Sequence, residues 1–248
     1  MSGRDLCERT MEPLFPEVIA TRVQSVLTKI RSAEQKAGRP AGTVRLVAAT
    51  KLVSVEHMAE GVRAGLSIVG ENRVQEALSK MTAFTQSPVQ WHFIGHLQRR
   101  KVRSVVGVFD LIHSVDSLDL AQEIDRRAGD AGRQQNVLLE VNIGEESTKT
   151  GFHPNDIVRA VSLMAELSHT CIKGVMTIPP PATDPNLARP YFRQLRALAG
   201  QIAALGIPTV RMDELSMGMS HDYEVAIEEG ATMVRIGTAI FGERAARH

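Results

Sequence analysis

The chain has 248 residues, of which 43% are hydrophobic and 23% are charged, and its formal net charge is +1. This length and composition are those of an ordinary water-soluble globular protein with a sizeable core. A net charge so close to zero gives no electrostatic reason to expect nucleic acid or an anionic membrane as the main partner.

Cysteine usage and the N-terminus indicate the compartment. The two cysteines, Cys7 and Cys171, lack the spacing of a disulfide framework or a metal site, which favours a reduced, cytoplasmic environment. The first residues lack the continuous apolar stretch of a signal peptide, and no run approaches the roughly 18 apolar residues of a membrane span. We expect residues 1–14 to form a loosely ordered extension and residues 15–248 to form one domain.

In chain order, an amphipathic helix over 18–37 is followed by short apolar runs that alternate with helical patterns. The expected strands are 44–49, 67–70, 91–94, 111–113, 137–141, 172–176, 209–212 and 233–236. The expected helices between them are 55–64, 74–84, 97–106, 118–131, 156–167, 188–205 and 222–229. Strict alternation indicates a parallel sheet, and eight units in this length predict a single (β/α)₈ TIM barrel with an extra N-terminal helix. The alternative is an open doubly wound sheet, whose GxGxxG first turn is absent here.

Nearly every expected strand ends in polar residues. Lys51 follows the first strand, Asn72 follows the second, and the third and fourth contribute His92, His96 and His113. Active sites of such barrels lie at the carboxyl ends of the strands. The sequence therefore predicts a polar pocket at this end of the barrel.

Two loops near the end of the chain favour a phosphate group. The stretch SMGMS (216–220) precedes the expected helix 222–229, and RIGT (235–238) ends the last strand. Backbone N–H groups at a helix start, together with Ser and Thr hydroxyls, suit a phosphate dianion. Either loop alone could serve only a tight turn, but phosphate sites in barrels often follow strands seven and eight. Two such loops in consecutive units predict a phosphate site.

Lys51 lies across the mouth from this predicted phosphate site. An isolated lysine usually lies on the surface with its stem on apolar neighbours, but an amine among apolar walls or near another cation attacks aldehydes more readily. A phosphorylated aldehyde cofactor satisfies both features: pyridoxal 5′-phosphate (PLP), bound to Lys51 as a Schiff base. Arg235, on the same side of its strand as Gly237, supplies such a cation and could face the ring nitrogen of the cofactor.

Other polar clusters receive plainer interpretations. The stretch HFIGH (92–96) spans a strand and a turn, so it lacks the helical spacing of an HExxH zinc site, and we expect no metal. The histidines are expected to hydrogen-bond around the pocket floor. The cationic run QRRKVR (98–103) is expected to be a solvated face, and Lys149 to meet solvent or a passing anion.

Six stretches carry a family resemblance: LVAATK (46–51), GENRVQEAL (70–78), WHFIGHLQ (91–98), VNIGEESTKTGF (141–152), GVMTIPP (174–180) and ELSMGMSHDYEVAIEEGATMVRIGTAIFG (214–242). Together, and in this order, they resemble the pyridoxal-phosphate homeostasis protein family, the single-domain relatives of the alanine racemase barrel domain. The resemblance implies a Schiff base at Lys51, a cofactor contact from Asn72, and Arg235 facing the pyridine nitrogen. It implies phosphate binding by Ser216, Met219, Ser220, Gly237 and Thr238.

The chain departs from the family pattern at two places. Where members often have SKTKP, this chain has Thr50-Lys51-Leu52-Val53-Ser54, without the second lysine and the proline. Where members have GENYVQE, Arg73 replaces the tyrosine. Both changes concern the edge of the pocket and cofactor exchange rather than binding itself.

The resemblance leaves functions of different classes open. The first is a non-catalytic PLP carrier in intracellular vitamin B6 homeostasis, monomeric and able to deliver PLP to apo-enzymes. The second is an amino acid racemase, which needs acid/base groups on both faces of the substrate. In alanine racemases a tyrosine of a partner's second domain serves the face opposite the lysine. This chain ends soon after Gly242, and its only tyrosines are Tyr191 and Tyr223. The carrier is therefore favoured. A phosphosugar-type barrel enzyme with Lys51 as a Schiff-base catalyst is a third possibility.

Overall fold

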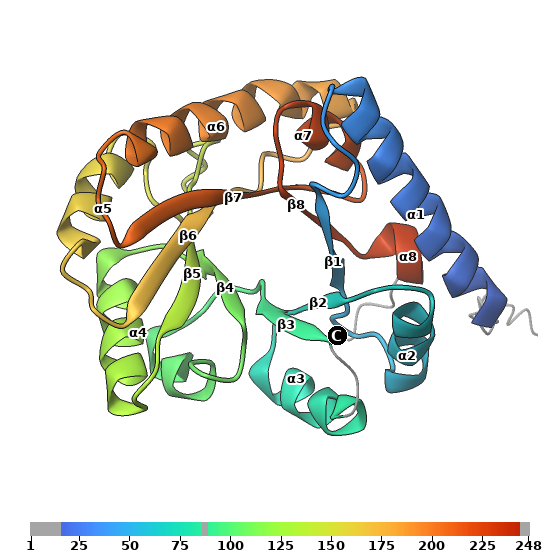
Figure 1. Ribbon diagram of the computed structural model, residues 1–248, viewed down its shortest axis with the longest axis horizontal. Helices are drawn as coiled ribbons and strands as arrows, with labels where there is room; N and C mark the ends of the chain where they lie inside the picture. The colour runs from blue at the N-terminus through green and yellow to red at the C-terminus, as the bar shows by residue number, and fades with distance from the viewer. Residues whose placement is uncertain (1–15, 86–88, 244–248) are drawn as a thin grey trace, which may run out of the picture.

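Eight parallel strands, in sequence order, close into a barrel with helices around its outside (Figure 1). The computed structural model describes residues 16–85 and 89–243. The predicted single (β/α)₈ barrel with an extra N-terminal helix is confirmed. The predicted extension, residues 1–14, lies outside the described residues.

The barrel strands are short. They are β1 (Arg45–Ala49), β2 (Ile68–Glu71), β3 (Gln90–Phe93), β4 (Leu111–Val115), β5 (Gln135–Glu140), β6 (Thr170–Met176), β7 (Val210–Met219) and β8 (Met233–Ile236). The α-helices are α1 (Pro16–Lys36), α2 (Val55–Arg63), α3 (Val74–Met81), α4 (Leu118–Asp130), α5 (Ile157–Met164), α6 (Arg189–Ala203), α7 (Tyr223–Glu228) and α8 (Thr238–Phe241). Three 3₁₀ helices join them: η1 (Thr82–Phe84), η2 (Arg99–Ser104) and η3 (Pro185–Ala188).

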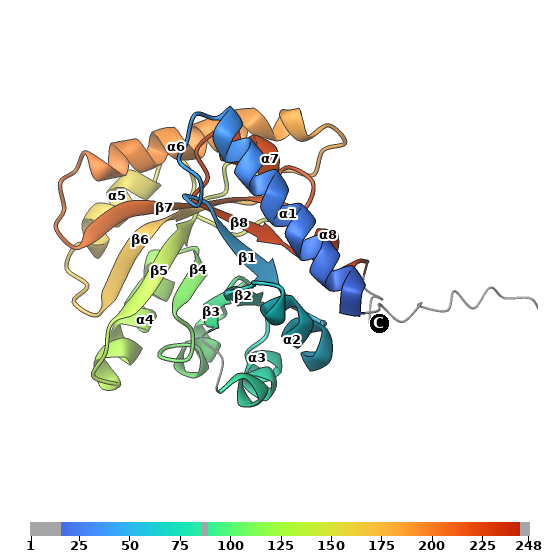
Figure 2. The same cartoon turned by 45° about the vertical axis from the view of Figure 1, so that its right-hand side comes forward.

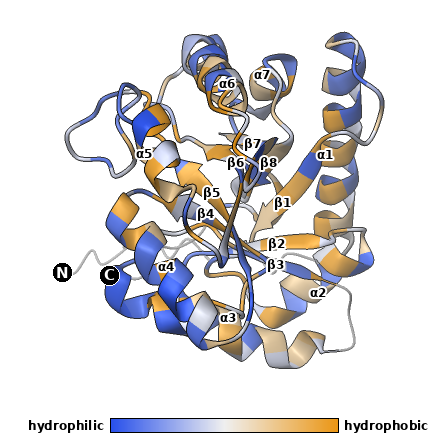
Figure 3. Cartoon of the chain, turned by 60° about the vertical axis from the view of Figure 1, so that its left-hand side comes forward, coloured by the Kyte–Doolittle hydropathy of each residue, from blue (hydrophilic) through white to orange (hydrophobic). Residues whose placement is uncertain are grey.

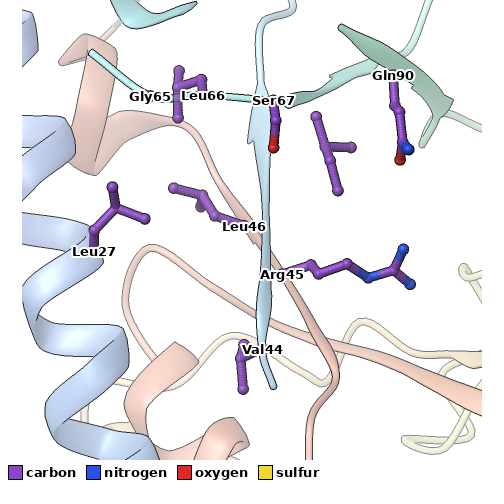
Figure 4. Close-up of a pocket in the computed structure, with 9 residues that line it drawn as sticks. Leu27, Val44, Arg45, Leu46, Gly65, Leu66, Ser67 and Gln90 are labelled. Carbon is purple, nitrogen blue, oxygen red and sulfur yellow. The ribbon is translucent and has the colours of Figure 1, made fainter. Parts of the chain in front are cut away.

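Alternation of side chains along the strands creates two cores. Arg45 and Leu46 leave β1 on opposite sides, and Leu46 points toward Leu27 of α1 (Figure 4). Inside the barrel an apolar layer is formed by Val47, Ile68, Leu111, Leu138, Met176 and Met233. The larger core lies between the barrel and the helices, whose outward faces are hydrophilic while the strands are mostly hydrophobic (Figure 3).

Helix α1 is the extra element before the barrel, and it covers the side where β1 and β8 meet (Figure 2). It packs against α2, α7 and α8. Its buried stripe consists of Ile19, Val23, Val26 and Ile30, at the three- and four-residue spacing of one helix face. Lys36 in its last turn pairs with Glu228 of α7. The helix thus covers the side of the barrel that includes β1, the strand that ends two residues before Lys51.

Strand β7 is longer than predicted. The prediction ended it at Met212 because Asp213 and Glu214 interrupt the apolar run, but the strand continues to Met219. Glu214 lies at the N-terminal end of the barrel, where it pairs with Arg45. Most of SMGMS therefore belongs to the strand rather than to a loop.

The segment 97–106 does not form the predicted α-helix; only the 3₁₀ helix η2 is present. Four cations crowd this segment: Arg99, Arg100, Lys101 and Arg103. Like charges three and four residues apart destabilise a helix, and Val102 is the one residue of η2 that is buried. The short helix α8 was not predicted, because four residues show no helical periodicity.

Candidate functional site

The order of strands places the predicted site residues on one half of the barrel mouth. Strand β1 lies between β8 and β2, with Val47 opposite Arg235 and Ala49 opposite Gly70. Lys51 lies two residues beyond Ala49, and Asn72 two residues beyond Gly70. The structure thus brings Lys51, Asn72 and the end of β8 to three adjacent strand ends.

Lys51 lies in a tight turn between β1 and α2. The N–H of Val53 donates to the carbonyl of Thr50 at 2.9 Å and closes the turn. Leu52 has a φ of 59°, in the left-handed region that favours glycine. The side chain of Lys51 is exposed. Within residues 16–85 and 89–243 its amine forms no hydrogen bond or ion pair, so it is available to a ligand.

Arg235 is a cation buried inside the barrel beneath the mouth. Its guanidinium donates to the carbonyl and hydroxyl oxygens of Ser216, at 2.9 and 2.6 Å, and to the carbonyl oxygen of Thr177 at 2.9 Å. Burial lowers the pKa of Arg235 to about 10, against the opposing charges of Glu140 and Asp222. The group therefore keeps its positive charge at neutral pH.

Two histidines continue this network toward the barrel floor. Nδ1 of His113 lies 3.0 Å from the hydroxyl of Ser216, and its Nε2 lies 2.9 Å from Nδ1 of His92. Burial, reinforced by Arg45, lowers the pKa of His92 to about 3. Burial also holds the pKa of His113 well below its ordinary value. Both rings are therefore neutral, and each can donate through one nitrogen and accept through the other.

His92 and His113 are hydrogen-bonded inside the barrel, as predicted, but His92 also lines a cavity at the N-terminal ends of the strands. His96 differs: it is half-exposed and faces Asp116 at 3.3 Å. No group of three or more potential metal-ligating side chains (His, Cys, Asp or Glu) occurs in the part of the chain that the structure describes.

The predicted phosphate residues separate into two places. The hydroxyl of Ser220 accepts from the N–H groups of Gly237 and Ala239, both at 3.3 Å, and so ties the loop after β7 to the start of α8. Thr238 is exposed at the first position of α8. Ser216, by contrast, is fully buried beneath Arg235.

Met219 contributes to the shape of this loop. Its N–H donates to the side chain of Asp222 at 2.6 Å, so that N–H is already satisfied. Just before it, Gly218 has a φ of 91°, and a Cβ there would lie 2.6 Å from the Cβ of Ala226. Only glycine permits α7 to pack this closely against the end of β7.

The other half of the mouth holds a cavity of about 360 Å³. Its lining comes from the ends of β3 to β6 and the loops after them: Ile94, Gly95, His96, Ser114, Glu140, Val141, Asn142, Thr148, Lys149, Thr150, Met176 and Ile178. Glu140 is the acid in the lining of this cavity, and it is partly buried. Burial raises the pKa of Glu140 to about 7, with a further rise from Asp116 that Arg235 and Lys149 oppose. Sequence reasoning missed Glu140, although it precedes Asn142 by two residues and so shares its face of the strand.

Asn142 and Lys149 stabilise the loop above this cavity. The amide of Asn142 donates to the carbonyl of Glu146 at 2.9 Å and accepts from the N–H of the same residue at 3.2 Å. Lys149, expected to meet solvent or a passing anion, pairs with Glu146 and donates to the carbonyl of Pro179 at 3.3 Å.

Two further cavities lie at the N-terminal ends of the strands. One, of about 330 Å³, lies between α1 and the starts of β1 and β2 and is lined partly by Leu27, Leu46 and Leu66 (Figure 4). The other, of about 430 Å³, contains Arg45 and His92. Both lie at the opposite end of the barrel from Lys51.

The half of the mouth from β7 to β2 has the groups that a phosphorylated aldehyde requires. Lys51 offers an amine without a partner among the described residues. Arg235 is a buried cation that its neighbours hold in place. Ser220 and Thr238 carry hydroxyls beside the first N–H groups of α8. A nucleophile, a cation and a polar loop on neighbouring strand ends therefore suit such a ligand chemically.

The fold and this site define a barrel of the alanine racemase class. Residues 22–245 match the family described as alanine racemase, N-terminal domain. A pyridoxal phosphate homeostasis protein of Aquifex aeolicus is 46% identical over 223 residues, covering 90% of this chain and 97% of the relative. The chain belongs to the family of pyridoxal phosphate homeostasis proteins.

Solved structures agree with this assignment. A protein of Bifidobacterium adolescentis is 38% identical with a TM-score of 0.88, covering 96% of this chain and all (100%) of that one. PipY of Synechococcus elongatus, solved with PLP bound, is 36% identical with a TM-score of 0.78, covering 90% of this chain and 100% of PipY. Within residues 16–85 and 89–243, no helix has the length and apolar character needed to cross a membrane.

Proposed function

We propose that this protein binds PLP through a Schiff base to Lys51 and takes part in intracellular PLP homeostasis. The observation that carries the proposal is the amine of Lys51, which has no partner among the described residues and follows β1, the strand beside β8 and its Arg235. Thr238 begins α8 just after β8. Membership of the homeostasis family and the PLP-bound relative support the choice of ligand.

The residues of the site have distinct roles in this proposal. Lys51 would supply the amine that bonds to the aldehyde carbon, with the aldehyde oxygen leaving as water. Ser220, Gly237 and Thr238 hold the phosphate, and Asn72 contacts the ring. Ser216 and the backbone of Met219 act indirectly, through Arg235 and the loop. When bound, PLP supplies a reactive aldehyde carbon and an electron-accepting ring.

Arg235 favours a carrier over an enzyme. A guanidinium has donors and no acceptor, so a ring nitrogen that faces Arg235 accepts a hydrogen bond and stays unprotonated. An unprotonated ring withdraws electrons weakly, which disfavours racemase chemistry. We infer a non-catalytic, monomeric, cytoplasmic carrier that delivers PLP to apo-enzymes. Delivery predicts that a PLP-dependent apo-enzyme gains activity faster from the loaded protein than from PLP released into solution.

Borohydride reduction followed by peptide mass mapping tests the proposal. We expect the PLP-treated protein to be yellow and to carry a pyridoxyl group on Lys51. Lys51→Met should lose the colour and this label. Lys149→Met is the matched control, because it removes a lysine from the opposite half of the mouth, and it should retain both. A wild-type protein that takes up no PLP, or that is labelled only at another lysine, contradicts the proposal.

A further inference from the structure

A buried lysine lies behind the turn that carries Lys51. Lys80, on α3, is 4% exposed, and its ammonium donates to three oxygens. They are the carbonyl of Thr50 at 2.7 Å, Oε1 of Glu71 at 2.8 Å and Oε1 of Glu76 at 2.7 Å. An ammonium has three donors, so the hydrogen-bonding capacity of Lys80 is filled.

The partners of Lys80 continue the contacts onto the turn itself. Oε1 of Glu76 also accepts from the N–H of Leu52 at 2.6 Å. Oε1 of Glu71 also accepts from the hydroxyl of Thr50 at 2.6 Å. The residues on both sides of Lys51 are therefore held by side chains from β2 and α3, while the side chain of Lys51 has no partner in the part of the chain that the structure describes.

The backbone at Leu52 requires such support. A left-handed conformation at a non-glycine residue is strained and persists only where its surroundings impose it. The N–H of Leu52 donates to a carboxylate that the ammonium of Lys80 holds in place. A buried ion pair is weak evidence of a contribution to stability. The groups of this ion pair, however, also hydrogen-bond to the backbone atoms that flank Lys51.

We propose that Lys80, Glu71 and Glu76 are positioning residues that fix the turn and hold Lys51 in the geometry that reacts with the cofactor. This inference rests on the proposed Schiff base at Lys51 and goes beyond it, because it concerns residues that touch the backbone around Lys51 and not the cofactor. Removing these contacts should therefore have two effects that can be measured separately: faster amide exchange in the backbone of the turn and weaker binding of PLP.

The test compares Glu76→Ala with Glu76→Gln, which keeps an acceptor oxygen for Leu52. Amide hydrogen exchange at Leu52 is measured in the cofactor-free protein, and the Kd for PLP is measured by visible absorbance. Losing the acceptor should speed exchange about tenfold and weaken PLP binding about tenfold, the factor that corresponds to one charge-assisted hydrogen bond. Glu76→Gln should stay within about threefold of wild type in both measurements.

Two further variants guard against a general loss of stability. Arg127→Met removes an i,i+4 partner of Glu123 on α4, in a more exposed ion pair far from the turn, and should change neither measurement. The double variant Lys80→Met with Glu71→Gln removes both buried charges together, and it should behave like Glu76→Ala. In Glu76→Ala and in the double variant, the visible circular dichroism of bound PLP should also change, because this signal reports the orientation of the cofactor.

The inference is overturned if Glu76→Ala matches wild type, if Glu76→Gln is as impaired as Glu76→Ala, or if Arg127→Met shows the same losses. A failure of the proposed function looks different. Lys51 would then remain unlabelled in every variant while the exchange difference at Leu52 persisted. That outcome rejects a role in cofactor positioning but leaves the bracing of the turn intact.

Discussion

Glu140 is the residue whose protonation should dominate the pH dependence of stability at the mouth. Burial raises its pKa from 4.5 to about 7, so the folded state binds this proton more tightly than the unfolded state. The contribution of Glu140 to the free energy of unfolding is therefore highest below pH 4.5, falls up to about pH 7, and is constant above that.

Glu140→Gln should remove this fall. At pH 8 the variant should be more stable than wild type by about 1–3 kcal/mol, since each pKa unit corresponds to about 1.4 kcal/mol, whereas at pH 4 the difference should vanish. Urea unfolding at pH 4, 6 and 8 measures the effect. Glu224→Gln, on the exposed face of α7, controls for the loss of one negative charge. A stability difference that stays constant across pH would contradict the assignment.

At the scale of single residues, the sequence predicts which residues lie at the mouth of the barrel, but not which buried residues hold them in place. Lys51 and Arg235 follow from their places on strands one and eight. The family resemblance places Ser216 among the phosphate residues, and the structure shows it hydrogen-bonded to Arg235 inside the barrel. Lys80 falls in the predicted helix 74–84, where a lysine normally faces solvent. Glu76 is its i,i+4 partner on α3, but the other two oxygens belong to Thr50 and Glu71, outside this helix, and no local pattern encodes those contacts.

At the scale of elements, apolar runs locate the strands well, and the exceptions have local causes. The length of β7 depends on its pairing with β6, whose register shifts between Ile172 and Gly174. A Cβ at Gly174 would lie 1.9 Å from the carbonyl oxygen of Glu214. This close approach cannot be read from periodicity, because it exists only when the two strands are paired.

Gly174→Ala tests this contact. The added methyl group must push β6 and β7 apart, so the free energy of unfolding should fall by about 3 kcal/mol, the upper range for overpacking. Gly200→Ala is the matched control: Gly200 lies inside α6, and a Cβ there would have no neighbour within 4 Å, so the substitution should stabilise by about 0.5–1 kcal/mol. Equal effects of the two substitutions in urea unfolding would show that the approach at Gly174 is not limiting.

At the scale of the whole molecule, the alternating pattern specifies the barrel, but a barrel alone specifies no chemistry. The mouth has two unlike halves. The ends of β7, β8, β1 and β2 carry the predicted cofactor residues, and the ends of β3 to β6 enclose the cavity with Glu140. An amino acid substrate would need a second acid/base group facing Lys51 across this mouth.

The described residues argue against a tyrosine in that role. Tyr223 is buried, and burial raises its pKa to about 12, while Tyr191 lies on α6 and packs against the outer core. The PLP-loaded protein should therefore not interconvert L- and D-alanine at ordinary enzyme rates of about 1–10³ per second. Chiral chromatography of the products, with an alanine racemase as positive control, measures this. Turnover at such rates would reject the proposed carrier function. If the Glu140→Gln variant then lost this turnover, Glu140 would be identified as the second acid/base group.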